Sequence, residues 1–446
     1  MNRNDPRPHL LYVAWGFPPA RSGGVYRALA TANAFAERGW RVTVLTADRE
    51  TFVRGTGIDP TLEALVHPSI TVERIPFASP ASQTDIREWS YWRAAAPELW
   101  TAAKTRRDWK AFPERGYGAW RRPLETAARA LHHRDPVDLT IATANPHVDF
   151  VAGNVLHREF GVPYVMDYRD AWQLDVFSGE RVSPPGSAVD DWERRLMASA
   201  TEVWFVNDPI RVWHQEVHPD AADRMHVVAN GYEPSFAKRL PRVRPSRGDG
   251  LVFGYIGTIS SQVPVAQLLE GWSIARQRSD LIATARLDLF GYLDHSGIPN
   301  QEVVDLVAAN ESEGVRHHGA VGKADIGETY AGIDALLLVL GTGVHVTSGK
   351  VFEYAATGIP IGAIHDPGNA ATEVLRTSPE WFPTPDLSGG AIADTLIRLG
   401  ERALAQTVPE RAAAQQWATR FERTHQLEPR IEALQALSAK TRGGTV

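Results

Sequence analysis

The sequence predicts an α/β protein made of two tandem Rossmann-like domains that face each other across a cleft. Short apolar runs typical of strands recur along the 446 residues, and each is followed by enough chain for a helix. This alternation indicates parallel, doubly wound sheets. A Pro-, Arg- and Gly-rich segment at residues 234–250 separates one series of runs from a second. We interpret this segment as an interdomain linker.

The first series begins with a strand–loop–helix–strand unit. His9–Trp15 is a short apolar run, apolar residues from Val25 to Ala36 recur at helical spacing, and Arg41–Ala47 is the next strand. The unit fits within about 40 residues, as a βαβ crossover requires. Further strands of this series are expected at 139–143, 164–168, 202–207 and 226–229.

The second series has the same character. Its strands are expected at 251–256, 287–290, 335–340 and 360–364, with helical segments between them. The tail at residues 410–440 is helical in pattern and adds no strand. We therefore expect an N-terminal Rossmann-like domain at 1–235, a C-terminal one at 248–410 and a helical segment at 411–446.

The composition excludes several classes of protein. Apolar residues make up 43% and charged residues 22% of the chain, which is ordinary for a globular protein and excludes a wholly disordered one. Because there is no cysteine, a disulfide scaffold, a thiol nucleophile and a cysteine-ligated metal are excluded. The net charge of −6 does not favour nucleic acid as a partner.

We expect a cytoplasmic protein. The first apolar run is short and is followed by Pro18-Pro19, unlike a signal peptide, and no run approaches the ~20 apolar residues of a spanning helix. Only six of the 47 basic residues are lysines, so a lysine inside a motif is informative. Such Arg- and Ala-rich usage is typical of GC-rich bacterial genomes.

Two glycines before the first helix are candidates for contact with an anion. Gly23 and Gly24 have no side chains, so a ligand can approach their backbone, and the helix N-terminus presents unpaired N–H groups. The alternative is that the pair only makes a turn. The segment lacks the Gly-x-Gly-x-x-Gly spacing of a dinucleotide fingerprint, which argues against a dehydrogenase.

The segment from Thr347 to Ile364 is the clearest candidate for ligand binding. Ser348 suits the N-cap of a helix that Gly349 and Lys350 open with free amides, and these groups could hold a diphosphate. Glu353 follows Lys350 by three residues, so both side chains share a helix face, and its carboxylate suits a ribose diol. An exposed Lys–Glu pair on an ordinary helix is equally consistent with this spacing.

Taken together, the motifs resemble GT-B fold glycosyltransferases similar to family 4. The Ser348–Ile364 segment is similar to their nucleotide-binding helix and the Gly-x-Pro strand after it, and Tyr12–Thr46 resembles their opening. Other segments that resemble the family, in chain order, are Thr143–His147, Asp167–Trp172, Asn230–Tyr232 and Gly254–Thr258. The matches are spread over most of the chain.

The resemblance implies transfer of a sugar from a nucleoside-diphosphate sugar to an acceptor, with retention at the anomeric carbon and without a metal. The donor, a co-substrate rather than a bound cofactor, is expected mainly on the C-terminal domain. The acceptor, a specialised metabolite or a cell-surface glycan precursor, is expected on the N-terminal domain. The 411–446 segment is expected to cross back onto that domain.

The residues and the resemblance together give the candidate site. For the donor diphosphate the candidates are Gly23, Gly24, Gly257, Thr258, Ser348, Gly349 and Lys350; for ribose, Glu353; for the nucleobase or sugar, Gly319, Val321 and His345. The candidate catalytic residues are His147, Arg169 and Asp170, which follow predicted strands, where α/β sheets bind ligands. The alternatives are a helix-capping histidine and an internal ion-pair network.

Two departures from the family pattern bear on the donor. His345 stands eight residues before Glu353, where many members have a glutamate, and no cation follows Thr258, where many have Arg and Lys. Charge neutralisation would then fall to Lys350, to free backbone amides, or to Arg27 or Arg169.

The adjacent histidines His317 and His318 do not predict a metal site. Neighbouring residues on a strand point to opposite faces, so they are poor joint ligands. Residues 316–321 instead resemble the family's loop that lies against the nucleobase. We expect no metal.

Residues 89–134 hold five tryptophans and ten Lys or Arg. The most plausible interpretation is amphipathic helices with buried tryptophans packed on the N-terminal domain. Alternatives are an acceptor pocket with aromatic walls and peripheral contact with an anionic membrane surface. Nucleic acid is the least plausible partner.

Two other functions fit the same resemblance. One is a nucleotide-sugar epimerase with the GT-B fold, which needs no acceptor, and the other is a non-catalytic regulator that binds nucleotides. Release of nucleoside diphosphate that depends on an acceptor would distinguish a transferase from both.

Overall fold

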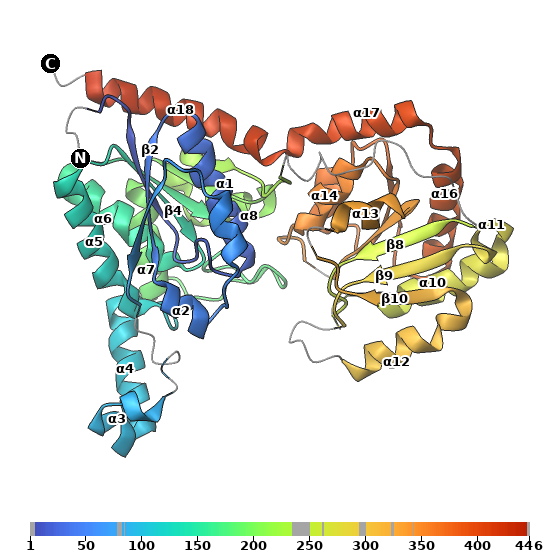
Figure 1. The fold of residues 1–446 in the computed structure, drawn as a ribbon, viewed down its shortest axis with the longest axis horizontal. Coiled ribbons are helices and arrows are strands. Elements are labelled where there is room, and N and C mark those ends of the chain that lie inside the picture. Colours follow the sequence, from blue (N-terminus) through green and yellow to red (C-terminus); the bar gives the residue numbers. More distant parts are fainter. Residues whose placement is uncertain are drawn as a thin grey trace. The chain divides into compact units, whose positions relative to one another are not determined.

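The computed structural model describes residues 5–77, 83, 85–233, 250–260, 263–293, 300–322, 325–341 and 343–443. The chain folds into two compact units (Figure 1). The first comprises Met1–Asp175, Glu180–Ala229 and Leu427–Val446, and the second comprises Val176–Gly179 and Asn230–Gln426. Apart from Gly250, the linker expected at 234–250 lies outside the described residues.

The first unit contains a seven-stranded sheet in the order β3-β2-β1-β4-β5-β6-β7, in which all paired strands are parallel. The strands are β1 (His9–Val13), β2 (Arg41–Ala47), β3 (Thr71–Ile75), β4 (Leu139–Ala144), β5 (Tyr164–Tyr168), β6 (Glu202–Phe205) and β7 (Met225–Val227). The helices are α1 (Gly23–Glu37), α2 (Arg49–Arg54), α3 (Tyr91–Ala95), α4 (Pro97–Ala111), α5 (Arg121–Arg134), α6 (Phe150–Phe160), α7 (Ala188–Ser199), α8 (Asp208–Val217) and most of α18 (Arg423–Gly443).

The strand order reverses between β1 and β4. The chain leaves β1 toward β2 on one side and leaves β4 toward β5 on the other, so right-handed crossovers place α1 and α6 on opposite faces of the sheet (Figure 1). The loops after these two strands border the topological switch point, where open α/β sheets bind ligands.

The core of the first unit includes the C-terminal helix. Leu10 and Tyr12 of β1 are fully buried in one cluster with Leu427, Ile431 and Leu434 of α18. The last helix therefore packs on the first unit, although it follows the second in sequence.

The second unit contains a six-stranded parallel sheet in the order β10-β9-β8-β11-β12-β13. Its strands are β8 (Val252–Ile256), β9 (Arg286–Phe290), β10 (Val315–Gly319), β11 (Ala335–Val339), β12 (Ile361–Ile364) and β13 (Trp381–Pro383). Its helices are α10 (Val265–Arg278), α11 (Asp280–Ala283), α12 (Gln301–Ala309), α13 (Ile326–Ala331), α14 (Gly349–Thr357), α15 (Ala370–Leu375), α16 (Gly389–Ala405) and α17 (Val408–Ala418). The switch point of this sheet lies between β8 and β11.

The two sheets confirm the predicted fold class of two Rossmann-like domains. Three strands were not expected, namely β3, β10 and β13, and each lies at an edge of its sheet. β3 and β10 are largely polar in sequence, so they lack the apolar run by which central strands are recognised, and β13, although apolar, is only three residues long. The tail also differs from the single helical pattern expected, because a short 3-10 turn at Thr419–Phe421 divides it into α17 and α18.

The aromatic and basic region at 89–134 is only partly as expected. Trp120 is fully buried and its Nε1 donates to Asp149 Oδ1 at 2.9 Å. Trp92 and Trp109 are 73% and 45% exposed, however, so the expectation of buried tryptophans is wrong for these two. Among the described residues, no helix has both the length and the apolar character needed to cross a membrane.

Candidate functional site

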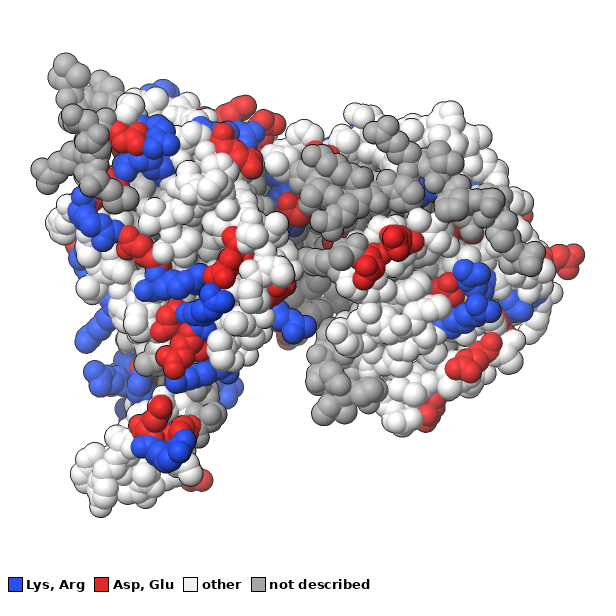
Figure 2. Space-filling view, in the orientation of Figure 1, with Lys and Arg blue, Asp and Glu red and all other residues white. Residues whose placement is uncertain are grey.

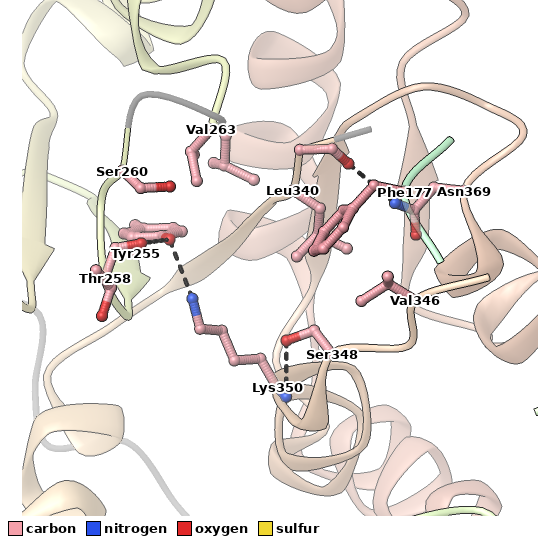
Figure 3. A pocket seen from close by; sticks show the side chains of 12 residues that line it. Phe177, Tyr255, Thr258, Ser260, Val263, Leu340, Val346, Ser348, Lys350 and Asn369 are labelled. Atoms are coloured by element: carbon pink, nitrogen blue, oxygen red, sulfur yellow. Dashed lines mark hydrogen bonds between the residues drawn. The ribbon is translucent and has the colours of Figure 1, made fainter. Parts of the chain in front are cut away.

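A cavity of about 330 Å³ lies at the switch point of the second sheet (Figure 3). It is bordered by the end of β8 and the loop after it, by the loop after β11 and by the start of α14. Its lining residues are Phe177, Tyr255, Thr258, Ser260, Val263, Val339, Leu340, Gly341, Val346, Ser348, Lys350 and Asn369.

The helix that opens onto this cavity begins as the sequence predicts. Ser348 is the N-cap of α14 in extended conformation, and its side chain accepts a hydrogen bond from the Lys350 amide at 3.4 Å. The helix ends at Gly358, whose φ of +66° is left-handed. The amide of Gly349 lies in the first turn, where helix N–H groups lack intrahelical acceptors. This end therefore suits an anion.

The Lys350 side chain extends from α14 toward β8, as Figure 3 shows. Its Nζ donates to Tyr255 Oη at 3.0 Å and lies 4.6 Å from the centre of that ring. No carboxylate among the described residues forms an ion pair with it. The ammonium group therefore faces the cavity with a phenol and an aromatic face as neighbours.

Burial lowers the pKa of Lys350 from 10.5 to about 8, because the charged form loses hydration, and the negative charge of Glu353 opposes this only in part. An anion beside Nζ would favour the charged form and raise this pKa again. The site is therefore electrostatically complementary to a phosphate or diphosphate group.

Gly257 makes room for the lysine. A Cβ at this position would lie 1.7 Å from Lys350 Nζ, and the φ of +149° is one that other residues rarely adopt. Thr258 follows, and its carbonyl accepts a hydrogen bond from Tyr255 Oη at 2.8 Å. The predicted diphosphate residues after β8 and before α14 thus come together around one cation.

The residues predicted to contact the ribose and the nucleobase or sugar do not line this cavity. Glu353 lies one turn into α14, where its charge contributes to the raised pKa values of Tyr330 and Tyr354, although burial is the larger cause. The predicted nucleobase or sugar contacts are Gly319, Val321 and His345. Gly319 ends the edge strand β10, and its carbonyl accepts from the Gly291 amide at 2.7 Å. The ribose and nucleobase assignments stay predictions.

The sequence did not indicate Phe177, Tyr255 or Asn369 as site residues. Tyr255 lies within a strand-like run, so its position near the end of β8 was a usable signal. Asn369 is the N-cap of α15, and its Nδ2 donates to the Gly341 carbonyl at 3.1 Å. Phe177 comes from a distant segment, and only the tertiary fold brings it to the cavity.

His147 lies at the switch point of the first sheet, just after β4. It is 4% exposed and its ring stacks on Trp172 with centroids 5.0 Å apart. Nδ1 lies 3.0 Å from Glu114 Oε1, and Nε2 lies 3.1 Å from the Asp170 carbonyl oxygen. Both neighbours are acceptors, so both ring nitrogens must carry protons to satisfy them.

The environment of His147 agrees with a protonated ring. Burial alone would lower its pKa, but the hydrogen bond and the charge of Glu114 outweigh burial and raise it. Glu114 also accepts from the backbone amides of His147 and Val148 at 2.8 and 2.9 Å. It is a positioning residue that the sequence did not reveal. The catalytic role of His147 stays a prediction, because its ring contacts are made within the protein.

Arg169, which pairs with Asp170, lies against Gly24 at the start of α1. The Arg169 Nη2 donates to Asp170 Oδ2 at 2.9 Å, and a Cβ on Gly24 would lie 1.7 Å from Arg169 Nη1. A Cβ on Gly23 would have no atom within 4 Å. The structure thus brings Gly24, Arg169, Asp170 and His147 into one cluster.

Arg27 is buried and pairs with the buried Asp167, with Nη2 to Oδ1 at 2.5 Å. This pair is internal to the first unit, so Arg27 is not an exposed cation.

No group of three His, Asp or Glu in the described part of the chain could hold a metal ion. His317 Nε2 contacts the Gly291 carbonyl oxygen at 2.9 Å, and His318 Nε2 lies 3.2 Å from Asp288 Oδ1.

Comparison with protein families identifies the first unit. Residues 22–231 match the family model described as glycosyl transferase 4-like domain. They form a family 4-like glycosyltransferase domain. A search of curated proteins gave no match.

The whole chain superposes on solved structures of the GT-B fold. A glycosyltransferase from Rickettsia africae aligns with a TM-score of 0.66 and 12% identity, covering 97% of this chain and 99% of the other. The Anabaena protein HepE, in complex with UDP and glucose, aligns with a TM-score of 0.55 and 16% identity, covering 96% of this chain and 99% of the other. A UDP-N-acetylglucosamine 2-epimerase homologue from Listeria monocytogenes aligns with 0.55 and 8%, covering 97% of each chain. At these identities the likeness shows the fold alone, and the family match indicates glycosyl transfer.

Proposed function

We propose that this glycosyltransferase uses a nucleoside-diphosphate sugar as its donor and binds the diphosphate in the cavity beside α14. The observation that carries the proposal is the Lys350 ammonium group, which lies in that cavity at a helix N-terminus without a carboxylate partner among the described residues. Helix amides and a cation converge on the position that a diphosphate would take.

The same groups would assist the reaction. Negative charge builds on the diphosphate as the glycosidic bond breaks, so a fixed ammonium group and the first-turn amides of α14 would stabilise the transition state more than the ground state. Burial already lowers the pKa of Lys350, and the developing charge would restore its proton affinity.

We further infer from the family resemblance that transfer proceeds with retention and without a metal. In that scheme an oxygen of the departing diphosphate accepts the acceptor's proton, so no protein base is required. The acceptor would be a specialised metabolite or a cell-surface glycan precursor. The buried cluster around His147 would then position the loop at Asp170 beside the acceptor.

The donor proposal is tested by calorimetric titration of the Lys350→Met variant with nucleoside diphosphates and with the corresponding nucleosides. Loss of a charged hydrogen bond should weaken diphosphate binding by roughly 10- to 100-fold. Nucleoside binding should stay unchanged. Lys440→Met, which removes an exposed lysine from α18, is the matched control. Equal losses for both ligands would show that Lys350 does not contact phosphate.

A second experiment distinguishes transfer from the two alternative functions. The protein is incubated with nucleotide sugars, with and without candidate acceptors, and release of nucleoside diphosphate is measured. Release that depends on an acceptor supports a transferase. Release without an acceptor indicates hydrolysis or epimerase chemistry, and tight binding without release indicates a regulator.

A further inference from the structure

Helices α3 and α4 form a projection from the first unit, defined here as residues 85–111. In Figure 1 it extends away from the sheet at the end opposite α18. None of the 15 residues of α4 is buried, and none of α3 is buried either. Helices without a buried residue add little hydrophobic stabilisation to their own domain, so the projection calls for a function other than completing the core.

The end of the projection is apolar. Tyr91, Trp92 and Leu99 are 76%, 73% and 75% exposed, and Ile86 beside them is 67% exposed. The rings of Tyr91 and Trp92 pack edge to face with centroids 5.5 Å apart. Figure 2 shows this end as a mostly uncharged surface. Exposed aromatic clusters of this kind mark contact surfaces rather than ordinary solvent-facing positions.

A basic groove of about 740 Å³ lies where α4 meets α5. Its charged lining residues are Lys104, Asp108 and the cations Arg106, Arg107, Lys110, Arg121 and Arg122. Lys104 pairs with Asp108, and Arg121 pairs with Glu125 at 2.8 Å. The other four cations form no ion pair with any described residue, so the groove has a net positive charge available to a partner.

We propose that this projection binds the surface of an anionic lipid membrane. Tyrosine and tryptophan favour the boundary between headgroups and acyl chains, where their rings are apolar and their O–H and N–H groups stay hydrated. Basic side chains close to such a boundary are attracted to anionic headgroups. The projection carries both features, with the aromatic side chains at its end and the basic groove where α4 meets α5.

Two other partners fit these features less well. In a two-fold dimer through this face, the same patch would meet itself, so the unpaired cations of both copies would gather in one interface. Nucleic acid would use the groove, but it gives no role to Ile86 and Leu99, which have no base-stacking face. An anionic membrane uses both the cations and the apolar side chains.

The test is flotation of the full-length protein with phosphatidylcholine vesicles, with and without phosphatidylglycerol. We expect binding only to the anionic vesicles, and it should weaken as salt is raised. Arg106→Gln with Arg107→Gln should lower the partition coefficient by roughly 10- to 30-fold. Tyr91→Ala with Trp92→Ala should lower it by about tenfold or more.

Matched controls remove similar groups elsewhere. Arg316→Gln with Lys440→Gln removes two exposed cations, and Leu404→Ala with Val408→Ala removes two exposed apolar side chains. All four double variants should keep the wild-type melting temperature, because none of these side chains is buried. Equal binding to neutral and anionic vesicles, or equal losses in the control variants, would overturn the proposal. The proposal would also be overturned if the protein bound no vesicles and instead self-associated in sedimentation experiments, with the Tyr91→Ala and Trp92→Ala double variant abolishing that self-association.

Discussion

The charged groups at the two switch points are arranged in opposite ways. In the first unit, the three cations around β4 and β5 each have a carboxylate partner, in the pairs Arg27–Asp167, His147–Glu114 and Arg169–Asp170. In the second unit, Lys350 faces the Tyr255 ring and hydroxyl, and no described carboxylate pairs with it.

This difference indicates what each region is built to do. A paired, buried cation is already stabilised by the fold, and removing its partner leaves an uncompensated charge. An unpaired cation that burial has partly dehydrated lowers the stability of the free protein, and an anionic ligand would recover that free energy. The first region therefore resembles a fixed scaffold, and the second resembles a binding site prepared for an anion.

The largest effect is expected from Glu114→Gln in the first region. The variant leaves the His147 ring buried without its carboxylate, so the free energy of unfolding should fall by about 2–4 kcal/mol. The measurement is urea denaturation, with Glu98→Gln on the exposed surface of α4 as control. A loss no larger than that of the control would show that the His147–Glu114 pair does not stabilise the fold.

The same variant has a definite pH dependence. The folded-state pKa of His147 is raised above its usual 6.5, so the pair's stabilisation is fully present below pH 6.5 and is lost as the pH rises through the folded-state pKa. The difference in stability between the wild type and Glu114→Gln should therefore be greater at pH 6 than at pH 9. A difference that grows with pH would contradict the protonated ring.

In the second region, Gly257→Ala should be the most damaging small substitution. Its Cβ would collide with Lys350 Nζ, and the backbone φ of +149° is unfavourable for alanine. We expect a loss of about 1–3 kcal/mol in the free energy of unfolding, together with a loss of diphosphate affinity similar to that of Lys350→Met. Gly349→Ala is the control for stability, because a Cβ there meets no protein atom within 4 Å. If calorimetry finds wild-type diphosphate affinity in Gly257→Ala, the position of the Lys350 ammonium group does not determine binding.

The pKa of Lys350 adds a smaller, graded effect. Since this pKa is about 8 in the free protein, a bound diphosphate must be accompanied by proton uptake at higher pH. Diphosphate affinity should fall about fivefold from pH 8 to pH 9, and the fall should approach about tenfold for each further pH unit. Lys350→Arg should remove this dependence, because arginine stays protonated throughout the range. An identical pH profile in that variant would assign the dependence to another group.

The central strands of both sheets could be predicted from the sequence, whereas their edges could not. Ala335–Val339 is buried throughout and is a continuous apolar segment, and Arg41–Ala47 is buried from Val42 onward and has no charged residue after Arg41. Edge strands such as Val315–Gly319 carry a mixture of exposed and buried residues. Their strand conformation depends on pairing with a neighbour, which local sequence does not reveal.

The residues of the candidate site likewise fall into two groups, those with a local sequence signal and those without one. Ser348 and Lys350 could be predicted, because capping and charge are local properties. Glu114 and Phe177 could not, since each acts through residues far away in the sequence. Glu114 precedes His147 by 33 residues and lies in a region dominated by tryptophan and arginine. Only the fold shows that its carboxylate is the acceptor for the histidine.

The smallest effect is expected from Gly24→Ala, the counterpart of Gly257→Ala in the first region. A Cβ there would also lie 1.7 Å from the end of a flexible cationic side chain, Arg169 Nη1, but Gly24 lies in a helix, whereas Gly257 has the left-handed φ of +149°. Arg169 can therefore move aside, and the free energy of unfolding should change by no more than about 0.5 kcal/mol. Turnover should fall if the position of Arg169 contributes to catalysis, while nucleotide affinity should stay near that of the wild type. Gly23→Ala, whose Cβ meets nothing within 4 Å, is the adjacent control. Equal turnover in both variants would show that Arg169 is only a structural partner of Asp170. That result would strengthen the contrast between the first region as a fixed scaffold and the second as a binding site for an anion.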